Sequence, residues 1–206
     1  MELLRTANAG VLLKMDGNSI LIDGVCPAYP PYLGTPERLR EALLQAPPDA
    51  LAFTHRHPDH HDMAFADAFQ KNTLRPILWA EDPRGATIGN LKITPVPTRH
   101  VGKADIPHVS YVVQGSKCAW ITGDASPLVW RGRNLPKPDV LIVTHAYAAT
   151  PAAWKRTKEY GAAHIIILHM PDPAEDSYGI WPAVLGMTAG EQNVHILPLE
   201  EKIILD

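Results

Sequence analysis

The chain has 206 residues, of which 46% are hydrophobic and 20% are charged, and its formal net charge is −3 at pH 7. These values are typical of a globular protein that can bury a sizeable core, and we expect one domain over residues 1–206. The slightly acidic balance disfavours nucleic-acid binding, which needs a basic surface. No stretch approaches ~18 consecutive apolar residues, so we expect no membrane span.

The start of the chain and its cysteines indicate a cytoplasmic protein. Residues 1–5 lack the basic and apolar regions of a secretory signal peptide. The two cysteines, Cys26 and Cys118, form neither a metal-type CxxC pair nor a disulfide framework.

Strands and helices alternate along the predicted chain. Asp16-Gly17-Asn18 between two apolar runs is typical of a β-hairpin turn, and Thr35-Pro36 supplies an N-cap and a first-turn proline for a helix. We expect strands over residues 9–15, 19–23, 49–54, 74–80, 91–97, 110–113, 117–122, 138–144 and 164–168, and two more between 194 and 205. We expect helices over residues 35–45, 61–69, 150–160 and 176–187, and a proline-rich loop over 25–33.

The residues that follow the predicted strand 49–54 indicate metal binding. Four histidines and two aspartates lie within residues 55–62. In an extended segment His55 and His57 point to the same side and could bind one divalent cation. Asp59 and His60 follow a proline and could turn toward a second position. Imidazole and carboxylate ligands suit zinc first, with manganese and iron as further candidates.

Further polar residues stand at the ends of later predicted strands. His100, Asp124, His145 and His169 each follow an apolar run, and His145 is followed by Tyr147. His108 competes with His100, because both precede the predicted strand 110–113. His164 lies at the start of its strand rather than at the end, so we expect a structural role for it.

The pattern His55-x-His57-x-Asp59-His60 resembles the HxHxDH signature of the metallo-β-lactamase superfamily. The later residues His100, Gly123-Asp124 and His169 follow in the order that this family shows. The resemblance therefore covers nearly the whole chain. The resemblance implies an α/β fold, a metallo-β-lactamase-like αββα sandwich in a single domain.

The resemblance also implies two metal positions that share one aspartate. His55, His57 and His100 would hold the first metal, while Asp59, His60 and His169 would hold the second. Asp124 would bridge the two. The expected cofactor is two Zn²⁺ per chain, with Mn²⁺ or Fe²⁺ as alternatives, and Asp23 at the end of the opening hairpin would support the metal loop.

These expectations together predict a dinuclear metal-dependent hydrolase that uses a metal-bridging hydroxide. The substrate would be a small-molecule ester, lactone or phosphoester, and an anionic one because two divalent cations leave the pocket net positive. Arg56, Arg99 and Lys103 could extend that bias or be solvated charges. Asp59 would take part in catalysis, and His145 and Tyr147 would face substrate or donate a proton, or His145 would only orient a ligand.

Departures from the family pattern exclude some branches of the superfamily. Asp62 stands where glycine is usual, and histidine rather than cysteine at position 169 argues against the best-known β-lactamase class. The His-Ser-Thr type motif of the tRNA-processing nucleases is missing between Asp124 and His169. Two alternatives stay open: a mononuclear iron oxygenase of the sulfur-dioxygenase type on the same fold, and a non-catalytic metal-binding module.

Overall fold

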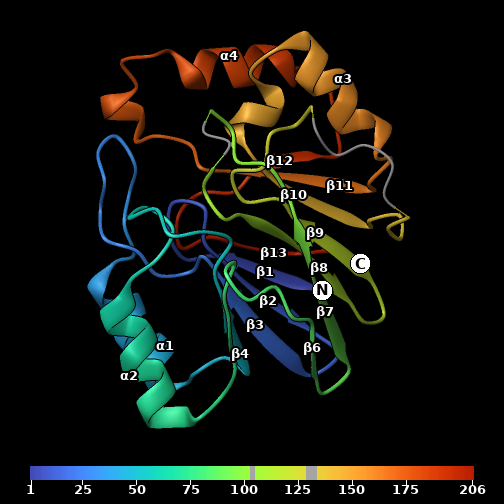
Figure 1. Cartoon of the computed structure of the whole chain (residues 1–206). Helices are drawn as coiled ribbons and strands as arrows, with labels where there is room; N and C mark the ends of the chain where they lie inside the picture. The colour runs from blue at the N-terminus through green and yellow to red at the C-terminus, as the bar shows by residue number, and fades with distance from the viewer. Residues whose placement is uncertain (103–104, 129–133) are drawn as a thin grey trace.

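The computed structural model describes residues 1–102, 105–128 and 134–206, and in them two β-sheets lie face to face between two pairs of helices. Figure 1 shows α1 and α2 outside the first sheet and α3 and α4 outside the second. This arrangement is the αββα sandwich that the sequence predicted. Among the described residues no helix is both long and apolar enough to cross a membrane.

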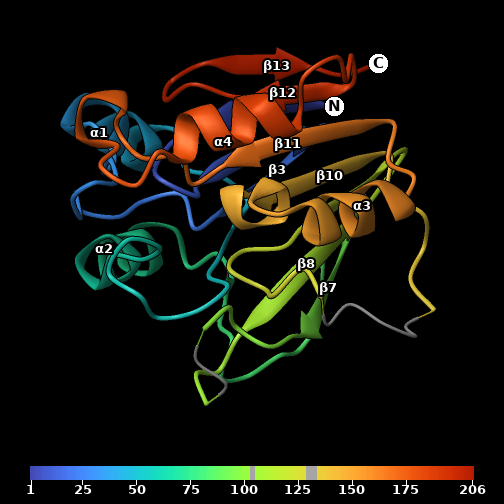
Figure 2. The same ribbon diagram turned by 90° about the horizontal axis from the view of Figure 1, so that it is seen from above.

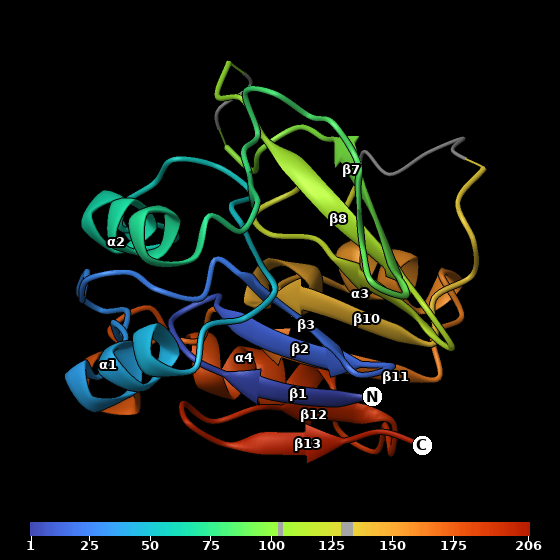
Figure 3. The ribbon, with the colours of Figure 1, turned by 90° about the horizontal axis from the view of Figure 1, so that it is seen from below.

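The first sheet has the strand order β13-β1-β2-β3-β4-β5. Antiparallel strands β13, β1, β2 and β3 form one part, and β4 and β5 extend it in parallel to β3. Because β1 pairs with β13, the two ends of the described chain lie close together (Figure 3). The strands are β1 (Glu2–Arg5), β2 (Val11–Met15), β3 (Asn18–Ile22), β4 (Ala50–Ala52), β5 (Ile77–Leu78) and β13 (Lys202–Ile204).

The second sheet has the order β12-β11-β10-β9-β8-β7-β6. Strands β9 to β12 are parallel to one another, whereas β6 to β9 form an antiparallel meander. The strands are β6 (Ala86–Ile88), β7 (Leu91–Pro97), β8 (Val109–Gln114), β9 (Cys118–Ile121), β10 (Val140–Thr144), β11 (His164–Leu168) and β12 (Val194–Ile196).

The four α-helices cover the outer faces of the sheets. Figure 2 shows α3 and α4 lying across the strands of the second sheet. Their bounds are α1 (Glu37–Gln45), α2 (Met63–Thr73), α3 (Pro151–Glu159) and α4 (Ile180–Met187), and short 3₁₀ turns occupy His145–Ala148 and Pro173–Glu175.

Side-chain alternation along the strands creates the layers of the core. In β10, Val140 and Ile142 pack between the two sheets, whereas Leu141 and Val143 pack under α3 and α4. This strand is buried on both faces, as its continuous apolar run predicts for a parallel strand. A third cluster, which includes Phe65 and Phe69 of α2, fills the space under the first sheet.

The structure differs from the sequence prediction mainly at element ends. β1 and β6 were not predicted, because they are short and β6 is only half-buried. The predicted strand 74–80 shrinks to Ile77–Leu78, since Leu74 ends α2 in the left-handed conformation (φ 55°) and is exposed. The predicted helix 61–69 begins two residues later, with Asp62 as its N-cap, and runs to Thr73.

Candidate metal centre

The seven predicted metal ligands meet at one end of the sandwich. His55, His57, Asp59 and His60 lie in the loop between β4 and α2, which starts at the carboxyl end of a parallel strand. His100 follows β7, Asp124 follows β9 and His169 follows β11. The two sheets therefore both contribute side chains to the same place, which we call the metal centre.

The ligand atoms form two groups that match the two predicted sets, and Asp23, His55 and His60 form a third group that overlaps both. Within each group the nitrogen and oxygen atoms lie within 4.8 Å of one another. The first group is His55, His57, His100 and Asp124, and the second is Asp59, His60 and His169. His145 belongs to none of these groups.

Asp124 faces both groups with different oxygens. Its Oδ2 lies 3.5 Å from Nε2 of His100 and 3.9 Å from Nε2 of His55. Its Oδ1 lies 3.4 Å from Nε2 of His60 and 3.7 Å from Nε2 of His169. The carboxylate thus stands between the two groups, in the position that a bridging ligand needs.

The buried histidine nitrogens of the centre fit a metal. Nε2 of His55, His60, His100 and His169 is buried in each case and has no hydrogen-bond partner with acceptable geometry. Four such unsatisfied atoms around one carboxylate would be costly in a centre that binds nothing. Nitrogen and carboxylate oxygen are also the donor set that zinc and iron accept.

Hydrogen bonds on the opposite ring nitrogen hold three of these imidazoles in place. Nδ1 of His55 lies 3.0 Å from the Thr54 hydroxyl, and Nδ1 of His100 lies 2.5 Å from the Val101 carbonyl. Nδ1 of His60 lies 2.9 Å from Oδ2 of Asp23. A proton on Nδ1 leaves the Nε2 lone pair free, so the surroundings prepare these rings to bind a cation.

Asp23 anchors the loop that carries the first four ligands. Its Oδ1 accepts from the Thr54 amide at 2.8 Å, and its Oδ2 accepts from the Thr54 hydroxyl at 2.6 Å as well as contacting His60. Gly123, at φ 53°, passes so close to Thr54 that a Cβ there would lie 2.7 Å from its hydroxyl oxygen. The step before Asp124 therefore requires glycine, both for its conformation and for the space.

Electrostatics in the centre favours a cation. Burial alone would raise the pKa of Asp124, but His169 and His60 outweigh it and hold that pKa well below its usual range. Burial alone would lower the pKa of His60, but Asp124 and Asp23 raise it well above the ordinary value. The aspartates thus create a negative potential that a proton on His60 partly balances, and a metal would displace that proton.

His100, and not His108, joins the ligand group. His108 is buried beside both rings, with its ring centroid 5.0 Å from that of His55 and 5.6 Å from that of His100. Its Nδ1 contacts the Thr98 hydroxyl at 2.8 Å. His108 therefore packs beside the rings of the candidate ligands and belongs to none of their groups.

The two residues that follow β10 have different surroundings. His145 lies beside the centre, with Nδ1 2.6 Å from the carbonyl of His169 and its ring 5.5 Å from the ring of His169. Tyr147 is fully buried in the hydrophobic cluster under α3 and α4 and does not line the cavity of the metal centre. The structure therefore brings His145, but not Tyr147, to the site.

A cavity of about 380 Å³ opens over the centre, and two tyrosines that the sequence analysis did not single out line it. Tyr29 and Tyr32 come from the proline-rich segment that we predicted only as a loop. Tyr32 contacts the ring of His169 edge-on, with centroids 4.3 Å apart. Burial, and then the charges of Asp124 and Asp59, raise the pKa of Tyr32 to about 12, so its hydroxyl keeps its proton at neutral pH.

The two described basic residues near the signature, Arg56 and Arg99, do not line this cavity. Arg56 forms an ion pair with Glu81 and lies over the ring of Trp79 at 4.4 Å. Arg99 is exposed and Lys103 lies outside the described residues.

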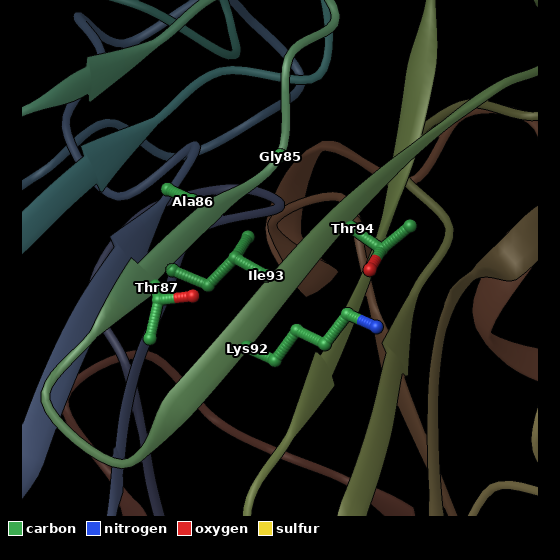
Figure 4. Close-up of a pocket in the computed structure, with 6 residues that line it drawn as sticks. All are labelled: Gly85, Ala86, Thr87, Lys92, Ile93 and Thr94. Atoms are coloured by element: carbon green, nitrogen blue, oxygen red, sulfur yellow. The ribbon is translucent and has the colours of Figure 1, made fainter.

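Another depression, of about 360 Å³, lies on the β6–β7 hairpin (Figure 4). Its lining consists of Gly85, Ala86, Thr87, Lys92, Ile93 and Thr94. It contains none of the predicted ligands, and we assign it no role.

Comparison with known proteins identifies the fold. No protein-family model and no curated protein matches the sequence. Among solved structures, the metallo-β-lactamase fold protein YhfI from Bacillus subtilis matches with a TM-score of 0.65 at 15% identity, and 98% of each chain is covered. The metallo hydrolase Igni18 from the archaeon Ignicoccus hospitalis matches with a TM-score of 0.63 at 18% identity, over 98% of this chain and 97% of that one.

A further match is an oxidising enzyme. CmlA, a diiron β-hydroxylase from Streptomyces venezuelae, superposes with a TM-score of 0.68 at 14% identity, over 99% of this chain but only 54% of its own. At these identities the likeness establishes the fold alone. The chain therefore has the metallo-β-lactamase fold, on which both hydrolases and an iron hydroxylase occur.

Proposed function

We propose that this chain of the metallo-β-lactamase fold is a dinuclear metal-dependent hydrolase. The observation that carries the proposal is the placement of Asp124, whose two oxygens face two separate groups of unsatisfied histidine nitrogens. One metal would be held by His55, His57 and His100, and the other by Asp59, His60 and His169, with Asp124 shared. Zn²⁺ is the first candidate, with Mn²⁺ or Fe²⁺ as alternatives.

The bound cations would supply a hydroxide nucleophile at neutral pH and would polarise the scissile carbonyl or phosphoryl group. The chain's own residues orient the side chains that would hold the metals. Asp23 fixes the His60 ring, and the side-chain amide of Asn8 donates to Oδ2 of Asp59 at 3.1 Å. Asp59 also lies 3.1 Å from Nε2 of His169. Because these contacts hold the Asp59 carboxylate beside His169 at the proposed second metal position, we assign Asp59 to the reacting groups.

The leaving group needs a proton, and Tyr32, which lines the cavity, offers one. His145 donates from Nδ1 to the His169 carbonyl, and burial together with His169 lowers its pKa, so it is neutral at pH 7 and its Nε2 carries no proton to give. The Tyr32 hydroxyl keeps its proton at that pH. We therefore assign the donor role, which the sequence suggested for His145 and Tyr147, to Tyr32.

The proposed substrate is a small anionic ester, lactone or phosphoester. Two divalent cations would exceed the negative charge of Asp59, Asp124 and a hydroxide, which favours an anion. Because Arg56 is paired with Glu81, this preference rests on the metals themselves. Tyr29 and Tyr32 also line the cavity, and their aromatic side chains suit an apolar part of the substrate.

The first test is elemental analysis of the purified protein, followed by hydrolysis of chromogenic lactones and phosphodiesters. We expect about two zinc or manganese ions per chain and turnover of one substrate class. Asp124→Ala should lower the metal content and reduce turnover by at least ~10³-fold, because it removes the shared ligand. Asp82→Ala, an exposed aspartate paired with Arg84, is the matched control and should keep both.

A second candidate is iron-dependent oxidation, which the fold likeness to CmlA favours. About one iron per chain, oxygen consumption and no hydrolysis would replace the hydrolase with an oxygenase. If metal removal unfolds the protein and no substrate turns over, the centre is a structural metal-binding module.

A further inference from the structure

A second cavity lies behind the wall of the metal centre. It has a volume of about 320 Å³ and is lined by Arg5 and by apolar residues: Leu33, Met170, Trp181, Leu199 and three prolines. It shares no lining residue with the cavity of the metal centre. Leu33 and Met170 directly follow Tyr32 and His169, so the same two segments form one wall of each cavity.

Arg5 is the one charged residue in this lining, and its charge is unusually placed. The side chain is 3% exposed at the end of β1. Its Nε donates to the Ala7 carbonyl at 3.1 Å and its Nη1 donates to the Leu197 carbonyl at 3.0 Å. Nη2 is buried and has no acceptor, and no carboxylate of the described residues pairs with the guanidinium.

Such a charge is costly unless something neutralises it. A buried cation without a counter-ion loses hydration, and two carbonyl acceptors restore only part of that loss. Burial lowers the pKa of Arg5 only to about 10, so the group stays charged at neutral pH. An anion beside Nη2 would supply both the missing acceptor and the missing charge.

The remainder of the lining defines the body of that anion. Trp181 uses its indole N–H on the Pro171 carbonyl at 2.9 Å, so it adds no free donor to the lining. The volume lies at the lower end of the range for small-molecule sites. We propose that this cavity binds a small organic carboxylate with a compact apolar body, with its carboxylate at Arg5 and its body against Leu33, Met170 and Trp181.

The test measures binding to protein freed of metal with a chelator, so that a carboxylate cannot bind through the metals. Calorimetric titrations use butanoate, hexanoate, octanoate and benzoate, with acetate, phosphate and hexanamide for comparison. We expect saturable one-to-one binding of at least one of the longer acids, and at least tenfold weaker binding of acetate, phosphate and hexanamide. Equal affinity for hexanoate and hexanamide, or no binding of any acid, would overturn the proposal.

Variants locate the binding site. Arg5→Met keeps an apolar side chain of similar length and should abolish the preference for the acid over the amide, whereas Arg84→Met on the exposed surface should keep it. Leu33→Trp leaves Arg5 intact and should block binding by filling the cavity, and the exposed Leu74→Trp is its control.

Asp124→Ala separates this site from the metal centre. The cavity proposal requires that Asp124→Ala bind the acid as the unaltered protein does. Loss of acid binding in Asp124→Ala, or unchanged binding in both Leu33→Trp and Arg5→Met, would show that the acid binds elsewhere and would overturn the assignment.

Discussion

At the scale of single residues, Asp23 joins the fold to the proposed chemistry. It ends the opening hairpin in the left-handed conformation, at φ 50°, and points its carboxylate at Thr54 and His60. The conformation is costly for most residues, but aspartate and asparagine tolerate it. A strained backbone at this point is thus compensated by three contacts that set the direction of a proposed metal ligand.

We predict that Asp23→Asn weakens metal binding by about 10- to 100-fold, the usual effect of removing a carboxylate behind a ligating histidine. Asparagine retains the backbone conformation, but it removes the charge that holds the proton on Nδ1 of His60. Competition titration with a chromophoric chelator measures the change. Asp49→Asn is the control, because Asp49 accepts comparable bonds from Ser19 far from the centre. Equal metal affinity in all three proteins would contradict the role of Asp23.

At the scale of elements, the start of α2 is stabilised by the residue that departs from the family pattern. Asp62 accepts from the Phe65 amide at 2.9 Å as the N-cap, and Arg40 of α1 donates to it at 2.6 Å. Burial alone would raise the pKa of Asp62, but Arg40 and the Phe65 amide outweigh it and lower that pKa. Asp62 therefore links the two helices that cover the first sheet.

We predict that Asp62→Ala lowers the free energy of unfolding by about 1–2 kcal/mol, because it removes both the cap and the ion pair. Asp62→Asn keeps a good cap and should lose less. Since the pKa is lower in the folded state, the carboxylate stabilises the protein above the unfolded pKa of about 4, and that gain is lost as the pH falls through the folded pKa.

The difference between the unaltered protein and Asp62→Asn should therefore shrink in acid. Urea unfolding of chelator-treated protein at several pH values measures it. Asp67→Asn, on the exposed face of the same helix, is the control and should show little change. A deficit of Asp62→Asn that stays constant down to pH 2 would contradict the argument.

At the scale of the whole molecule, the metal centre joins the two sheets. Four proposed ligands follow β4 of the first sheet, and three follow strands β7, β9 and β11 of the second. The site between the two sheets exists only in the folded state, so the binding energy of a cation there adds to the stability of the sandwich.

We predict that removing metal lowers the midpoint of thermal unfolding. At a free metal concentration 100 times the dissociation constant, each site adds about 2.7 kcal/mol. In a chain of this length, the loss of one occupied site should lower the unfolding midpoint by roughly 5–10 °C. Differential scanning calorimetry with and without chelator measures it, and Asp124→Ala should respond far less. An identical midpoint with and without metal would contradict binding between the sheets.

The sequence by itself determined the sandwich and the chain order of the candidate ligands. Apolar runs of strand length ending in histidine or aspartate carry that information locally, and His55, His57, Asp59 and His60 lie within one short loop. The assignment of all seven residues as ligands, and the single domain over residues 1–206, stay predictions.

Only the tertiary structure separated His100 from His108, moved Tyr147 into the core and brought Tyr29 and Tyr32 over the centre. It also placed Arg5 of the unpredicted strand β1 beside residues near positions 33, 170 and 181. Such contacts depend on which segments distant in sequence pack together. The layering of the sheets and helices decides which segments meet. The residue pattern within one segment does not specify its neighbours in space.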